Sequence, residues 1–118
     1  METPRAVLEK AYAAFNARDL PRLRPLIHPK AVWPNTLDMG QPLSGKEAVL
    51  GHFARVFATI DADIELIEVL EETPDALLIE AQYSVKTADG RVWTDSRARL
   101  VYHFRDGLLS GMTILSGF

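Results

Sequence analysis

The sequence predicts an α+β fold in which three N-terminal helices pack against a curved antiparallel sheet of four long strands plus one short strand. Apolar residues recur at three- and four-residue spacing up to Ile60, and at two-residue spacing from Asp63 onward. Asp-Gly pairs at 89–90 and 106–107 divide the second region, and such pairs are a strong hairpin signal. Helices and strands therefore segregate along the chain instead of alternating.

Length and composition fit one globular domain over residues 1–118. The chain has 118 residues, of which 47% are hydrophobic and 25% charged, with a formal net charge of −3. Its basic residues are scattered, which argues against a nucleic-acid partner. We find neither an apolar run of about 18 residues nor a signal-peptide pattern. We therefore expect a soluble, cytoplasmic protein with no nucleic-acid or membrane partner.

The sequence gives no support for a metal site or a cofactor. Cysteine is absent, and the three histidines lie far apart without ligand spacing. We place His28 at the end of the second helix and His52 beside the apolar face of the third, where its ring can be exposed. His103 falls on the outer face of the sheet.

The first two helices have clear start signals. Thr3 is a good N-cap, and Pro4 occupies the first helical position, where its missing N–H costs nothing. Asp19 can cap a shorter second helix, which the prolines at 25 and 29 end.

A short strand at 30–33 and a third helix complete the N-terminal half. Ser44 and Glu47 form a capping-box pattern, in which a hydroxyl and a carboxylate each accept a free backbone N–H at a helix start. We therefore expect the third helix to begin there and to run to Ile60.

The pairing of the second and third long strands follows if residues 89–90 form a two-residue turn. The predicted inner face then pairs Val85 with Thr94, Tyr83 with Ser96, Ala81 with Ala98, Ile79 with Leu100 and Leu77 with Tyr102. The predicted outer face pairs Lys86 with Trp93, Ser84 with Asp95, Gln82 with Arg97 and Glu80 with Arg99. The first set is mostly apolar and the second brings opposite charges together, which supports this register.

Three segments resemble the nuclear transport factor 2-like superfamily, in particular its SnoaL-like and ketosteroid isomerase-like members. They are AYAAFNARDLPRLRPLIHPKAVW at 11–33, SGKEAVLGHF at 44–53 and YHFRDGLLSGM at 102–112. The resemblance implies a cystatin-like cone with a cavity between the helices and the sheet. It leaves the activity open, because the superfamily includes isomerases, cyclases, dehydratases, epoxide hydrolases and non-catalytic proteins.

The catalytic positions of the steroid isomerases are only partly matched. Their base position falls on Asn35, which cannot accept a proton at neutral pH, and their helix tyrosine falls on Ala11, next to Tyr12. Their acid position falls on Tyr102, which can still donate a hydrogen bond. The resemblance therefore does not imply a steroid isomerase with an aspartate base at position 35.

Other chemistries have weaker support. Asp38 can act as a base if desolvation raises its pKa, or it can simply cap a turn, which we favour. The alternation of Asp95, Arg97 and Arg99 resembles the Asp-Arg-Asp set of the epoxide hydrolases. The predicted register sends all three outward, which favours a solvated salt-bridge ladder.

Two functions of different class remain. One is a cofactor-independent isomerase, cyclase or hydrolase acting on a small, largely apolar molecule, with Asp38, Asn35 and Tyr102 as catalytic groups. The other is a non-catalytic ligand-binding or dimerisation domain; a designed scaffold on this fold is a third possibility. The residues expected to line the pocket are Trp33, Tyr12, Phe15, Phe53, Phe57, Tyr83, Ser96 and Leu100.

The outer face of the sheet is expected to be covered in a homodimer. It carries Trp93, Val101 and, depending on a bulge in the last strand, Met112, Ile114 and Phe118. The proteins that the chain resembles commonly dimerise through their sheets. The sequence does not decide which residues of the last strand face the pocket.

Overall fold

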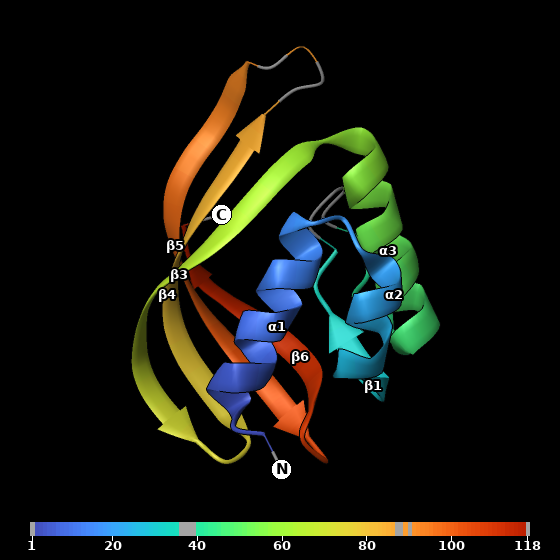
Figure 1. Ribbon diagram of the computed structural model, residues 1–118, viewed down its shortest axis with the longest axis vertical. Helices are drawn as coiled ribbons and strands as arrows, with labels where there is room; N and C mark the ends of the chain where they lie inside the picture. Colours follow the sequence, from blue (N-terminus) through green and yellow to red (C-terminus); the bar gives the residue numbers. More distant parts are fainter. Residues whose placement is uncertain (1, 36–39, 87–88, 90, 118) are drawn as a thin grey trace.

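Three helices cover the concave face of one curved, six-stranded sheet (Figure 1). The computed structural model describes residues 2–35, 40–86, 89 and 91–117. The elements are α1 (Pro4–Asn16), α2 (Leu20–Leu23), the 3₁₀ turn η1 (Arg24–Leu26), β1 (Ile27–Trp33), β2 (Leu43–Ser44), α3 (Lys46–Thr59), β3 (Asp61–Thr73), β4 (Ala76–Lys86), β5 (Val92–Arg105) and β6 (Leu108–Ser116). The α+β prediction is confirmed, with one additional two-residue strand, β2.

The sheet is mixed, with strand order β2-β1-β6-β5-β4-β3. Strands β3 to β6 form an antiparallel meander, and β1 joins it in parallel beside β6. The only parallel pair among the described strands thus links the helical half of the chain to its last strand. Strands β2 and β3 are left as the two edges.

The start of α1 is as predicted. Thr3 Oγ1 accepts a hydrogen bond from the Ala6 N–H at 3.2 Å, and Pro4 is the first helical residue. Val7, Leu8 and Tyr12 are buried on the inner stripe, where the 3.6-residue period places them. The sequence signals and the packed face therefore agree for this helix.

The second helix is shorter than predicted. Asp19 caps it by accepting the Arg22 N–H at 3.2 Å, but one turn of 3₁₀ helix follows and β1 already begins at Ile27. Pro29 is tolerated inside β1 because β1 pairs with β6 only at Ile27 and Val32, so its missing N–H interrupts no ladder bond.

We predicted that His28 lies at the end of the second helix, but the structure places it in β1. Its Nδ1 accepts the Lys30 N–H at 3.0 Å, so Nε2 carries the proton and donates to Asp106 Oδ2, also at 3.0 Å. This buried ring attaches β1 to the β5–β6 turn.

The predicted capping box at the start of α3 does not form. Gly45 is the N-cap, with φ 96° and no side-chain cap. Ser44 cannot take this position because it belongs to β2, where it pairs with Val32 of β1. Glu47 instead accepts two hydrogen bonds from the Arg24 guanidinium, at 2.7 and 3.2 Å. The local signal marked the helix start correctly, but tertiary pairing uses the two side chains differently.

The β4–β5 register is confirmed at every predicted pair except the outermost. Lys86 pairs with Val92 and not with Trp93, because the register shifts by one residue after Val85. Glu80 and Arg99 face each other across the strands as predicted. No ion pair joins these two side chains in the described part of the chain.

The last strand contains the bulge that the sequence left open. Met112 pairs with Tyr102 and Ile114 with Leu100, so both belong to the inner face, and Thr113 takes the outer position beside Val101. Met112 and Ile114 are therefore not members of the outer apolar patch. The side chain of Trp93 and residue Phe118, two further members of that patch, lie outside the described residues.

The core fills the space between the helices and the sheet. Its largest fully buried side chains include Leu8, Ile27, Leu77, Ile79, Leu100 and Leu109. No helix in the described ranges is long and apolar enough to cross a membrane. In the same ranges, no group of three or more histidine and carboxylate side chains is arranged to hold a metal ion.

Candidate functional site

The main cavity lies between α1, α3 and the concave face of the sheet. It contains about 660 Å³ of space not filled by atoms, part of it open to solvent. Its lining is almost entirely apolar and aromatic, and is formed by Leu8, Ala11, Tyr12, Phe15, Leu23, Ile27, Trp33, His52, Phe53, Val56, Ile64, Tyr83, Tyr102, Leu109 and Met112.

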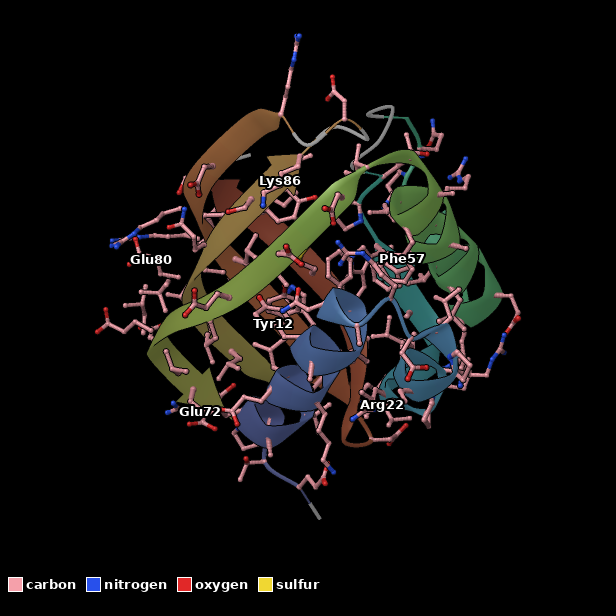
Figure 2. The ribbon with its side chains drawn as sticks, turned by 45° about the horizontal axis from the view of Figure 1, so that its top comes forward. Tyr12, Arg22, Phe57, Glu72, Glu80 and Lys86 are labelled. Carbon is pink, nitrogen blue, oxygen red and sulfur yellow. The ribbon has the colours of Figure 1, made fainter. Side chains whose placement is uncertain are left out.

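Two tyrosine hydroxyls form the polar centre of this cavity. The hydroxyl oxygens of Tyr12 on α1 and Tyr102 on β5 are 2.8 Å apart, and the two rings meet edge to face. Figure 2 shows Tyr12 between α1 and the sheet, whereas Glu80 points away from the helices. A hydroxyl has one proton and two lone pairs, so one tyrosine donates to the other and the acceptor keeps its own proton to donate elsewhere. The pair can therefore donate a hydrogen bond to a molecule in the cavity.

Burial keeps both hydroxyls protonated. It raises the pKa of Tyr12 far above the usual value, and the charge and hydrogen bond of Tyr102 raise it further. Burial also raises the pKa of Tyr102 well above its usual range, although its hydrogen bond with Tyr12 partly offsets this. Neither phenol can act as a base near neutral pH, and both remain neutral hydrogen-bond donors.

Aromatic rings from three elements form the wall beside the tyrosine pair. The Trp33 ring lies 5.6 Å from Phe53 and 6.1 Å from Tyr102, measured between centroids. Phe15 meets Phe53 edge to face at 6.0 Å. Rings in contact with one another present a rigid apolar surface that suits a flat or ringed ligand.

His52 is a cavity residue that sequence reasoning missed. The sequence left the exposure of its ring open; the ring is only 2% exposed and lines the cavity, with its centroid 6.0 Å from that of Phe53. Val49, His52 and Val56 follow a three- and four-residue spacing along α3, and this pattern could have revealed the buried stripe. Imidazole is the side chain best suited to exchange protons near neutral pH.

Of the residues predicted to form the site, the structure brings together Tyr12, Phe15, Trp33, Phe53, Tyr83 and Tyr102. Phe57 contacts Phe15 from outside the lining, and Leu100 is fully buried in the core. Ser96 donates its hydroxyl to the Gly117 carbonyl at 2.9 Å. Asn35 is half-buried just beyond β1, and Asp38 lies outside the described residues.

The alternation of Asp95, Arg97 and Arg99 is not part of this cavity. All three side chains are exposed, on the face of β5 opposite to Ala98 and Leu100. Asp95 accepts hydrogen bonds from Gln82 and Ser84 on the neighbouring strand. This arrangement belongs to the outer face, as the register predicted.

Comparison with known proteins agrees with this architecture. RV0760c from Mycobacterium tuberculosis, in complex with estradiol-17beta-hemisuccinate, is 18% identical and has a TM-score of 0.84, covering 98% of this chain and 95% of that chain. A computationally designed 17-OHP binder is 17% identical, with a TM-score of 0.83 and coverages of 98% and 94%. An LEH-like epoxide hydrolase from M. tuberculosis is 13% identical, with a TM-score of 0.77 and coverages of 92% and 78%.

At these identities the structural likeness establishes the fold alone. No curated protein matches the sequence at a significant level. The model of the SnoaL-like domain matches residues 8–112, which include most of α1, the aromatic wall and the tyrosine pair. The chain belongs to the SnoaL-like domain family.

Proposed function

We propose that this protein binds a small, largely apolar molecule that carries a hydrogen-bond acceptor, such as a carbonyl or phenol oxygen. The observation that carries the proposal is the Tyr12–Tyr102 hydroxyl pair in a mostly apolar cavity. A molecule that places its oxygen at this pair receives a hydrogen bond, and its apolar part leaves water for the aromatic wall. The RV0760c complex with estradiol-17beta-hemisuccinate and the designed 17-OHP binder share this fold and support the proposal.

Binding can be measured through Trp33, whose ring lies next to that of Tyr102. The chain has two tryptophans, so Trp33 is the one that remains in a Trp93→Phe background. We expect estradiol to change its fluorescence saturably and to raise the melting temperature. Tyr102→Phe should weaken estradiol binding by about tenfold, the size expected for one lost hydrogen bond. If estradiol and simple alkylphenols leave both signals unchanged, the proposal fails.

If the bound molecule is turned over, the chemistry is of the acid–base type. We propose His52 and Asp38 as the groups that exchange protons, Asn35 as a group that orients the substrate, and Tyr102 as the donor to an oxygen that gains negative charge. Isomerisation, cyclisation and hydrolysis are all compatible with such a set. Activity should then depend on pH and be lost in His52→Gln or Asp38→Asn while binding persists.

The alternative is a binding domain without catalysis. It is favoured by Asn35, which stands where a base would be expected, and by the two tyrosines, which stay neutral. Under this alternative the cavity binds ligands with unchanged affinity in Asp38→Asn, and mass spectrometry finds the ligand unaltered after prolonged incubation. Altered ligand that disappears in the His52 or Asp38 variants would favour the enzyme.

We also propose that the chain forms a homodimer through the outer face of the sheet. The distribution of charge on this face supports the proposal. Exposed carboxylates follow β3, exposed arginines follow β5, and β4 lies between the two rows. A twofold axis near β4 places each acidic row over the basic row of a second copy. Exposed apolar side chains, including Leu115 at 54%, lie on the same sheet.

Sedimentation velocity tests the dimer. The double variant Arg97→Glu/Arg99→Glu should be monomeric, and mixing it with Glu65→Arg/Glu68→Arg should restore a heterodimer. Arg22→Glu, on the helical side, serves as the matched control and should not change the sedimentation coefficient. A wild-type protein that is monomeric at high micromolar concentration would rule the dimer out.

A further inference from the structure

Arg18 has an unusual backbone for its residue type. It follows α1 in the left-handed region, with φ 57°. Its N–H donates to the Phe15 carbonyl at 3.0 Å, and the Asp19 N–H donates to the Ala14 carbonyl at 2.9 Å. This pair of bonds is the Schellman motif, whose left-handed position is usually glycine. A residue held in a disfavoured conformation suggests that its side chain has a role that requires this position.

The guanidinium of Arg18 is held from three directions. Its Nη1 donates to the carbonyls of Phe15 and Asn16, at 3.1 and 3.4 Å. Its Nη2 bonds Asp61, and Asp63 lies 3.5 Å from Nη1, so the end of α1 is joined to the start of β3. The side chain of Arg18 is 27% exposed. Its position is therefore fixed by two backbone carbonyls and two carboxylates.

The same group covers two phenylalanine rings. Its Cζ lies 5.9 Å from the centroid of Phe15 and 5.6 Å from that of Phe57, within range of a cation–π interaction. The two rings meet edge to face at 5.2 Å. Arg18 therefore holds one ring from α1 and one from α3 together.

This stack forms one boundary of the cavity. Phe15 lines the cavity, whereas Phe57 and Arg18 lie outside the lining. Tyr83 also lines the cavity, and the positive charge of Arg18 partly offsets the increase in its pKa that burial causes. The guanidinium thus lies close behind this wall, on its solvent side.

We propose that Arg18 is a positioning residue that determines ligand specificity. By fixing Phe15 against Phe57 at this boundary of the cavity, it limits the length of the molecule that the cavity accepts. This inference rests on the proposed binding function. It predicts a change in the preferred ligand length when Arg18 is removed, which a general loss of stability would not produce.

Binding of a series of para-alkylphenols, from ethyl to nonyl, tests the proposal. In the wild type, affinity should rise roughly threefold to fourfold with each added methylene, as for apolar burial, and then fall once the chain reaches the wall. In Arg18→Ala, the optimum should move to longer chains, with at least a tenfold gain for the longest members. Arg18→Gly allows the left-handed backbone and serves as the second variant if alanine prevents folding.

Two further variants sharpen the test. Asp61→Asn/Asp63→Asn removes the carboxylates but keeps the arginine, and should shift the optimum in the same direction by a smaller amount. Arg22→Ala removes an exposed arginine from α2, and should leave the whole series unchanged.

The possible failures differ in kind. If Arg18→Ala and Arg18→Gly both bind every member with the same fold-change and an unmoved optimum, the inference is wrong and the proposed function stands. If neither estradiol nor any alkylphenol binds the wild type, the proposed function fails and this inference fails with it; if estradiol binds but no alkylphenol does, only this inference fails.

Discussion

The side-chain amide of Asn16 bonds both backbone groups of Ile64. Its Nδ2 donates to the Ile64 carbonyl at 2.8 Å, and its Oδ1 accepts the Ile64 N–H at 2.9 Å. Ile64 belongs to β3, an edge strand, so one amide side chain takes the place of a neighbouring strand at this residue. Because Ile64 lines the cavity, this contact also fixes part of its wall.

Removing this amide should destabilise the fold. Asn16→Ala leaves two backbone groups without their partner, and we expect a loss of about 1 to 3 kcal/mol in the free energy of unfolding. Asn16→Asp can still accept the N–H but cannot donate to the carbonyl, so it should also be destabilised. Urea unfolding measures both, with the exposed Glu9→Ala as control. A change below about 0.5 kcal/mol in Asn16→Ala would contradict this interpretation.

The tyrosine pair should show strong coupling. Tyr12→Phe or Tyr102→Phe leaves the other buried hydroxyl without its partner, with an expected cost of about 1 to 3 kcal/mol each. The double variant has no hydroxyl left to satisfy and should cost less than the sum of the two single changes. A double-mutant cycle by urea unfolding measures this coupling, and additive losses would contradict it.

High pH should unfold the protein through its tyrosines. The pKa values of Tyr12, Tyr83 and Tyr102 are raised in the folded state, chiefly by burial. Above about pH 10 the unfolded chain therefore releases protons that the native state retains. Below that pH this stability is fully present. Above that pH, each tyrosine with a raised pKa lowers the free energy of unfolding by about 1.4 kcal/mol per pH unit.

Absorbance at about 295 nm follows phenol ionisation directly. The phenolate signal of the wild type should rise together with unfolding as the pH increases. Tyr12→Phe/Tyr102→Phe should show a shallower loss of stability over the same range. If all three tyrosines ionised near their usual pKa while the protein stayed folded, this prediction would be contradicted.

Two glycines should respond in opposite ways to alanine. A Cβ on Gly111, in β6, would lie 3.1 Å from the Val32 carbonyl oxygen on β1 and 3.5 Å from the His103 ring on β5. A Cβ on Gly51, in α3, would meet no atom within 4 Å. Gly111→Ala should therefore cost about 1 to 3 kcal/mol, and Gly51→Ala should gain about 0.5 to 1 kcal/mol. Thermal and urea unfolding of the pair decide the comparison, and a gain in both would refute the tight contact.

The correct predictions from the sequence concern elements whose structure depends on residues close together in the chain. The β4–β5 register follows from an Asp-Gly pair and from charges that face each other, and the cap at Thr3 depends on one turn of helix. The role of Ser44 was mispredicted because its pairing partner, Val32, belongs to another element. A competing tertiary contact is invisible to a local pattern.

The candidate site shows the same limit. The inward positions of Tyr12 and Tyr102 follow from periodicity, but their hydrogen bond joins two distant elements and could not be predicted. His52 was missed because a polar residue on the border of an apolar stripe can turn either way, and the packing of α3 decides the direction. The bulge that turns Met112 inward depends in the same way on the strand beside it.

The parallel pairing of β1 with β6 has a consequence for how the chain folds. The meander from β3 to β6 is built from neighbouring hairpins and can form early, whereas Ile27 must find Leu109 across most of the sequence. We therefore expect the helices and the aromatic wall to join the sheet late, because closing this long loop has a large entropic cost. Folding rates should therefore respond more to changes in the hairpins than to changes in β1, and an intermediate with a formed sheet but no cavity would expose the apolar surface that later binds the ligand.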